Sequence, residues 1–186
     1  MRGIPALMYH HVTPAGSSIN VTPGNFDRQM RFLKENGYQT LHTGEFLDVI
    51  KGQRQIPKKA VIITFDDGYK DNYTYAFPVL KKYNLPATVF VIINEIERHD
   101  RLSWQEIEDM RGSGIITFGS HALGPQPLID IESEEELRRQ IFDSKKIEPV
   151  ALPFFAAIGG DIDSIAESGQ YDIILIPIAS QDEIPG

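Results

Sequence analysis

The sequence is most informative at residues 61–69, which read Val61-Ile62-Ile63-Thr64-Phe65-Asp66-Asp67-Gly68-Tyr69. Residues 61–65 are apolar or β-branched, as is typical of a buried strand, and the strand stops at two carboxylates and a glycine. In folds with parallel strands, ligands bind outside the carboxyl ends of the strands. Asp66 and Asp67 are therefore candidate functional residues; the plain alternative is a pair of solvated turn residues.

Other apolar runs alternate with segments of helical periodicity, which fall at residues 26–33, 46–50 and 73–80. This alternation predicts one α/β domain over residues 1–186 with a mainly parallel sheet, either open or closed as a barrel. The strands are expected at residues 6–10, 60–65, 87–93, 115–118, 154–157 and 173–176.

Two further helix starts are marked by the Ser-x-x-Glu capping box, in which each side chain binds the free backbone N–H of the other residue. These boxes are Ser103 with Glu106 and Ser133 with Glu136. Pro78 falls inside a periodic segment, so we expect it to kink that helix or to delay its start.

Composition narrows the choice of partners and ligands. The 186 residues carry 18 Lys and Arg against 26 Asp and Glu, a net charge of −8, so no nucleic-acid partner is expected. There is no cysteine, so any metal must bind nitrogen and oxygen ligands. No apolar run approaches the ~20 residues that cross a bilayer. The start has no stretch of signal-peptide length, which fits a cytoplasmic chain or one whose export signal has been removed.

A second predicted strand also ends in a polar side chain, at Thr117-Phe118-Gly119-Ser120-His121. A carboxylate and an imidazole at the ends of neighbouring strands form half of a zinc or similar divalent site, and the other carboxylate is left free to act as a base. This combination indicates metal-assisted hydrolysis. A structural, hydrogen-bonded histidine is the alternative.

These motifs resemble, in order and spacing, the polysaccharide deacetylase family (NodB homology, carbohydrate esterase family 4). The matching segments are residues 64–69, Leu102-Ser103-Trp104 and Gly119-Ser120-His121. The opening Leu7-Met8-Tyr9-His10-His11-Val12 is similar to members that act on poly-β-1,6-N-acetylglucosamine. The resemblance implies a distorted, incomplete (β/α) barrel that removes N-acetyl groups from an N-acetylated polysaccharide. It also implies a divalent metal, usually zinc, and a location outside the cytoplasm or at the cell surface.

The resemblance also assigns roles to residues. Asp66 matches the general base, and Asp67 and His121 match metal ligands. Backbone N–H groups near Gly68 and Tyr69 would help to stabilise the oxyanion. We expect Tyr69, Trp104 and His10 to contact the substrate, although aromatic residues at such positions also serve in cores.

Three features depart from the family pattern. Pro125 stands where a second histidine ligand is expected, and His10, His11 and Gln126 are candidates to replace it. The arginine of the third motif is absent, whether the motif is laid on residues 151–153 or 156–158. No histidine follows His121 to act as a general acid, and we expect the C-terminal part to be shortened.

Three functions therefore stay open. The first is a deacetylase that is active in its complete form, and the second is a glycan-binding pseudoenzyme of the same fold. The third is a Mg²⁺-binding phosphotransfer domain, which the sequence disfavours because such a site needs a basic residue at a later strand end. Residues 154–158 and 173–178 are apolar there.

Overall fold

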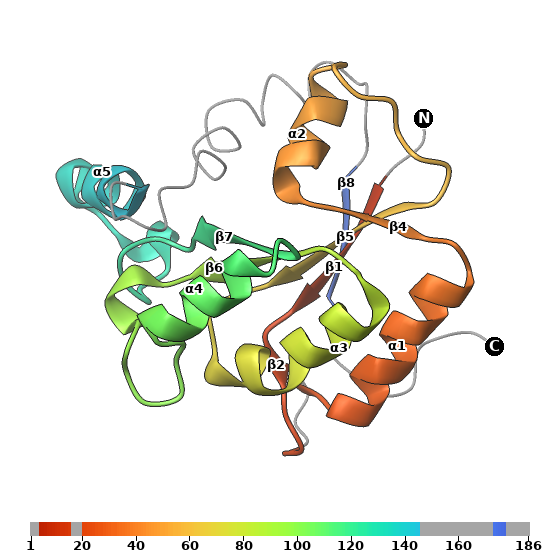
Figure 1. Ribbon diagram of the computed structural model, residues 1–186. Helices are drawn as coiled ribbons and strands as arrows, with labels where there is room; N and C mark the ends of the chain where they lie inside the picture. The colour runs from red at the N-terminus through yellow and green to blue at the C-terminus, as the bar shows by residue number, and fades with distance from the viewer. Residues whose placement is uncertain (1–3, 16–19, 146–172, 178–186) are drawn as a thin grey trace.

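A parallel sheet forms the scaffold of the computed structural model, which describes residues 4–15, 20–145 and 173–177 (Figure 1). The sheet has six strands in the order β7-β6-β5-β1-β8, and β4 also pairs with β5. Every pairing in it is parallel. The strands are β1 (Ile4–Tyr9), β4 (Gln39–Leu41), β5 (Ala60–Phe65), β6 (Ala87–Val91), β7 (Ile116–Ser120) and β8 (Ile173–Pro177).

Strand β5 lies at the centre of the sheet and has three neighbours. One of its edges pairs with β1 over Ile62–Phe65. The other edge is shared: β4 pairs with Ala60–Ile62, and β6 pairs with Thr64 and Phe65. Because β4 and β6 share one edge of β5, the sheet is distorted. The expectation of an α/β fold with a parallel sheet, arranged as a distorted barrel, is confirmed.

Helices cover both faces of the sheet (Figure 1). On one face lie α1 (Pro23–Glu35), α3 (Phe77–Tyr83) and α4 (Trp104–Gly112), and on the other lies α2 (Thr43–Ile50). The side chains of β5 alternate between the two cores: Ile63 and Phe65 belong to the larger cluster, whereas Ile62 packs with Phe46 and Val49 of α2. Each buried side chain of this size contributes roughly 1.5–3 kcal/mol.

The helix starts follow the capping signals in most respects. Ser103 Oγ accepts a hydrogen bond from the Glu106 amide at 3.2 Å, and Glu106 Oε2 accepts one from the Ser103 amide at 2.8 Å. In α5 (Glu134–Phe142), only half of the second box forms. Ser133 Oγ accepts from the Glu136 amide, but the Glu136 carboxylate instead accepts from Arg139 and Gln140 one turn later.

Pro78 does not delay the helix, which runs from residue 70 to residue 83 without a break, but it falls where the hydrogen bonding changes from π to α. A π-helical turn, Asn72–Ala76, precedes α3, and α3 then begins at Phe77 with Pro78 in its first turn. The Phe77 amide donates to the Asn72 carbonyl five residues earlier, and this wider turn accommodates the proline that follows, which has no N–H to donate.

Some short elements carry too little periodicity to be predicted. These are β4 and the two-residue strands β2 (His11–Val12) and β3 (Asn20–Val21), which pair with each other. Strand β7 also runs two residues beyond its expected end, to Ser120. The strand expected at residues 154–157 lies outside the described residues. Among the described helices, none has the length and apolar character that crossing a membrane requires.

A substitution at Gly119 tests this packing. A Cβ atom built on Gly119 would overlap the ring of Phe90 on β6. We expect Gly119→Ala to lower the free energy of unfolding by about 1–3 kcal/mol, measured by chemical denaturation. Gly44→Ala in α2 is the control, because a Cβ added at Gly44 would meet nothing within 4 Å, and alanine there should be neutral or slightly stabilising. Equal stability of the two variants would contradict this account of the β6–β7 contact.

Candidate active site

The candidate site begins where β5 ends. The Asp66 amide donates to the carbonyl of Tyr9 at 2.9 Å and so extends the pairing of β1 and β5 by one residue. The chain then turns sharply, with φ of 71° at Asp67 and 70° at Gly68, both left-handed. A Cβ on Gly68 would lie 2.8 Å from Val91 Cγ1, so the close approach of this turn to β6 requires glycine.

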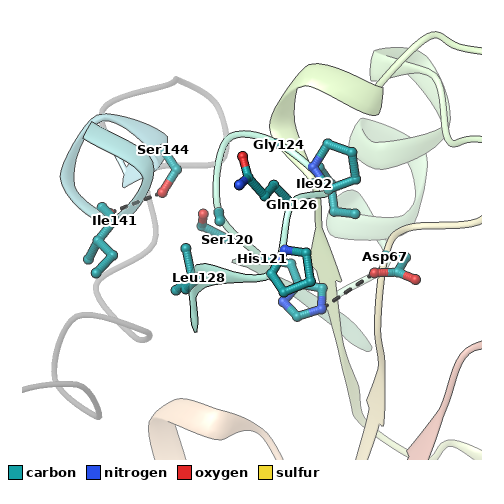
Figure 2. Close-up of a pocket in the computed structure, with 12 residues that line it drawn as sticks. Asp67, Ile92, Ser120, His121, Gly124, Gln126, Leu128, Ile141 and Ser144 are labelled. Atoms are coloured by element: carbon teal, nitrogen blue, oxygen red, sulfur yellow. Dashed lines mark hydrogen bonds and ion pairs between the residues drawn. The ribbon is translucent and has the colours of Figure 1, made fainter. Parts of the chain in front are cut away.

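The last residue of β6, Val91, also holds His121 in place. His121 follows β7, and its amide donates to the carbonyl of Val91 at 2.8 Å. Strand β6 lies between β5 and β7, so the turn at Gly68 and the start of the His121 loop meet over Val91. As a result, Asp67 Oδ1 and His121 Nε2 lie 3.4 Å apart (Figure 2).

This separation is suited to a shared cation. Carboxylate oxygen and imidazole nitrogen bind zinc at about 2.0–2.2 Å, and two such atoms on a tetrahedral ion lie about 3.4 Å apart. The Asp67 and His121 side chains therefore fit as two ligands of one divalent ion. The described residues contain no group of three or more histidine, aspartate and glutamate side chains that could hold a metal.

Asp66 is half-buried beside this pair. Burial raises the pKa of its carboxyl, because the charged form is desolvated, and the negative charge of Asp67 adds to this effect. The charges of His121 and His10 lower the same pKa and partly offset the rise. A carboxylate with a raised pKa takes up a proton more readily and is therefore better suited to act as a general base.

A cavity of about 350 Å³ opens next to the Asp67 and His121 side chains (Figure 2). It lies between the end of β7, the loop that follows it and the C-terminal end of α5. Ser120 is only 4% exposed, and its hydroxyl has no hydrogen-bond partner within the described part of the chain. The cavity is lined by Asp67, Ile92, Ser120, His121, Ala122, Gly124, Pro125, Gln126, Pro127, Leu128, Ile141 and Ser144.

The candidate replacement ligands lie in different environments. His11 Nδ1 lies 2.6 Å from Asp71 Oδ2, so its imidazole is already paired. Burial raises the pKa of Asp71, and the His11 contact offsets only part of that rise. Gln126 lines the cavity, and its amide donates to the carbonyl of Asp130 at 3.2 Å. His10 lies close enough to Asp66 for its charge to affect that carboxyl.

The two aromatic residues expected to contact the substrate are placed differently. The ring of Tyr69 has the imidazole of His11 stacked on it at 3.6 Å and the guanidinium of Arg101 over it at 4.0 Å. The Tyr69 hydroxyl interacts with the side chains of Asp67 and Arg101. Burial, together with the charge of Asp67, raises the pKa of the Tyr69 hydroxyl. Trp104 is half-buried against the larger core and does not line the cavity.

Arg101 also contacts the candidate site, and the sequence did not single it out. Its guanidinium donates to the backbone carbonyl of Asp67 at 2.9 Å. No motif marks it, and its position just before Leu102-Ser103-Trp104 is the only available signal. The two placements considered for the third motif, at residues 151–153 and 156–158, lie outside the described residues.

The comparisons with known proteins agree with this fold and show the family of the chain. The family model described as polysaccharide deacetylase matches residues 53–149, a span that includes Asp66, Asp67 and His121. The chain belongs to the polysaccharide deacetylase family. Members of this family are typically metal-dependent.

Individual relatives are similar in sequence to a large part of the chain. YxkH of Bacillus subtilis is 37% identical over 144 residues, covering 77% of this chain and 50% of YxkH. A poly-β-1,6-N-acetyl-D-glucosamine N-deacetylase of Staphylococcus aureus is 31% identical over 136 residues, covering 62% of this chain and 47% of that enzyme. The chain thus spans about half the length of these two relatives.

A solved structure of a deacetylase has a similar fold. The deacetylase PplD of Streptococcus pyogenes, in complex with acetate, superposes with a TM-score of 0.71 at 30% identity. The match covers 77% of this chain and 66% of PplD.

Substitution of the paired side chains tests their ability to bind metal. We expect Asp67→Asn and His121→Gln each to weaken Zn²⁺ binding by at least about tenfold in calorimetric titrations, because each removes one of two converging ligands. Asp66→Asn is the matched control and should keep most of the affinity, because Asp66 is assigned to the proton rather than to the ion. A loss for Asp66→Asn as large as that for Asp67→Asn would contradict this division of roles.

Proposed function

We propose that this chain is a metal-dependent N-deacetylase that hydrolyses the acetamide groups of a polysaccharide of the N-acetylglucosamine type. The observation that carries the proposal is the 3.4 Å separation of Asp67 Oδ1 and His121 Nε2, with the Asp66 carboxylate beside them at the end of β5. The family, and the named activity of the Staphylococcus aureus relative, support the same substrate class.

The chemistry follows from the weak electrophilicity of an amide. Asp67 and His121 would hold a divalent ion, which when bound supplies Lewis-acid polarisation of the acetamide carbonyl and of a water molecule. Asp66 removes a proton from the water as its oxygen attacks the carbonyl carbon. The carbon–nitrogen bond then breaks to give acetate and a free amine. The proton held by Asp66 balances the one that the leaving nitrogen must gain.

The cavity beside His121 supports the binding of a sugar next to the reacting acetamide. Its volume of about 350 Å³ falls at the lower end of the range for small-ligand pockets. Leu128 and Ile141 give it apolar walls, and Gln126 and Ser120 line it as well. Apolar walls with a few polar groups suit a pyranose ring, which has apolar faces and a polar rim.

A glycan-binding pseudoenzyme is the second candidate, and one observation favours it. Pro125 lines the cavity where a histidine ligand is expected, and the described residues hold no third carboxylate or imidazole that completes a metal group. Two protein ligands bind zinc more weakly than three, so metal occupancy would limit hydrolysis. The pseudoenzyme would bind the same polysaccharide without releasing acetate.

Acetate release separates the two candidates. With β-1,6-linked N-acetylglucosamine oligomers and added Zn²⁺ or Co²⁺, we expect metal-dependent release of acetate. Asp66→Asn should slow this release by about 10²- to 10⁴-fold, the usual contribution of a general base.

Asp109→Asn is the matched control. Asp109 is an exposed carboxylate on α4 that contacts Tyr73 and Gln105, and its substitution should leave the rate unchanged. Oligomer binding without acetate release at any metal concentration would reject the deacetylase and support the pseudoenzyme. An unchanged rate for Asp66→Asn would reject the assigned base.

A further inference from the structure

The turn that carries Asp67 is in an unfavourable backbone conformation and therefore needs outside support. Asp67 and Gly68 are both left-handed, which suits glycine but is uncommon for a residue with a side chain. Asp67 lies beyond the last residue of β5, so its carbonyl needs a partner outside the strand pairing. That partner is Arg101, whose Nη1 donates to it at 2.9 Å.

Arg101 is itself held on several sides. Its side chain is only 14% exposed, and its Nε lies 3.9 Å from Glu95 Oε2. Its guanidinium lies 4.0 Å from the ring centroid of Tyr69, within the range of a cation–π contact. The planar guanidinium can stack on a ring and donate in its own plane at the same time, which a lysine ammonium cannot do.

The backbone joins the same two segments. Tyr69 and Arg101 form an isolated antiparallel bridge. The Leu102 amide donates to the Gly68 carbonyl at 3.0 Å, and the Lys70 amide donates to the Asp100 carbonyl at 2.9 Å. Backbone hydrogen bonds from the residues on either side of Arg101 therefore join the loop before α4 to the turn after β5.

A third segment covers the opposite face of Tyr69. The imidazole of His11 stacks on it with ring centroids 3.6 Å apart, and His11 is anchored by Asp71. Asp71 also accepts hydrogen bonds from the Val12 amide at 3.3 Å and from Asn72 Nδ2 at 3.0 Å. The ring of Tyr69 is thus fixed between an imidazole and a guanidinium from segments far apart in the sequence.

We infer that Arg101 is a positioning residue, whose guanidinium holds the Asp67 turn so that the Asp67 carboxylate stays opposite His121. Arg101 acts through the backbone of Asp67 and is not itself one of the residues that line the cavity. The effect on hydrolysis rests on the proposed function, whereas the effect on the turn does not.

Arg101→Ala tests this inference in the full chain. We expect Zn²⁺ affinity to fall by roughly 10- to 100-fold, as is typical when a partner that orients a ligand is removed. Amide hydrogen exchange at Lys70 and Leu102 should speed up at least tenfold, while exchange in α1 stays unchanged. Arg98→Ala is the matched control: Arg98 pairs with the same Glu95 at 3.0 Å but is exposed, and its substitution should change neither measurement.

Two further variants separate positioning from a general loss of structure. Arg101→Lys keeps the charge beside Glu95 and should fold with an unchanged thermal midpoint, yet lose part of the Zn²⁺ affinity. In the Asp67→Asn background, Arg101→Ala should cause little further loss, because residues that act through one another are not additive.

The opposite results would overturn the inference. Unchanged affinity and unchanged exchange in Arg101→Ala would show that Arg101 does not hold the turn. A full additional loss in the Asp67→Asn background would show that Arg101 acts elsewhere. If the wild-type chain binds no Zn²⁺, the proposed function fails, and the exchange rates of Lys70 and Leu102 still decide the role of Arg101.

Discussion

The carboxylate of Asp67 and the imidazole of His121 come within 3.4 Å although their strands are not neighbours. Strand β6 separates β5 from β7, and its last residue, Val91, is the point over which the two sides meet. Gly68 approaches the Val91 side chain so closely that a Cβ would not fit, and the His121 amide binds the Val91 carbonyl. Every chemical role assigned to this site depends on this convergence.

Residues around the turn stabilise the backbone conformation that brings Asp67 and His121 together. Asp67 adopts a left-handed conformation, and its carbonyl is captured by Arg101. Tyr69 is fixed between His11 and Arg101. A rigid turn keeps a carboxylate ready to bind a cation, because little freedom is lost on binding. Such support matters more in a site with two converging side chains than in one with three.

The sequence predicted the parts of the fold that depend on local pattern. The apolar run at residues 60–65 and the cap at Ser103 were predictable because strand burial and capping are set by a few adjacent residues. Parallel strands end at one edge of a sheet, so the approach of Asp67 and His121 could also be expected. The sequence could not show that only half of the Ser133 capping box forms, because Arg139 and Gln140 compete for the Glu136 carboxylate.

The contacts that support the site depend on long-range packing and could not be predicted from the sequence. His11 was a candidate ligand, but its partner Asp71 lies 60 residues further along the chain. Tyr69 was expected to contact the substrate, yet the structure covers both faces of its ring. Arg101 reaches Asp67 through a loop with positive φ at Glu97 and Asp100, which no periodicity announces.

The central claim is that Asp67 and His121 share one divalent cation. Anomalous diffraction from Zn²⁺-soaked crystals, recorded on both sides of the zinc absorption edge, tests it most directly. The account predicts a single strong peak within about 2.2 Å of both Asp67 Oδ1 and His121 Nε2. A crystal with no peak between these atoms, or with their side chains turned away from each other, would contradict it.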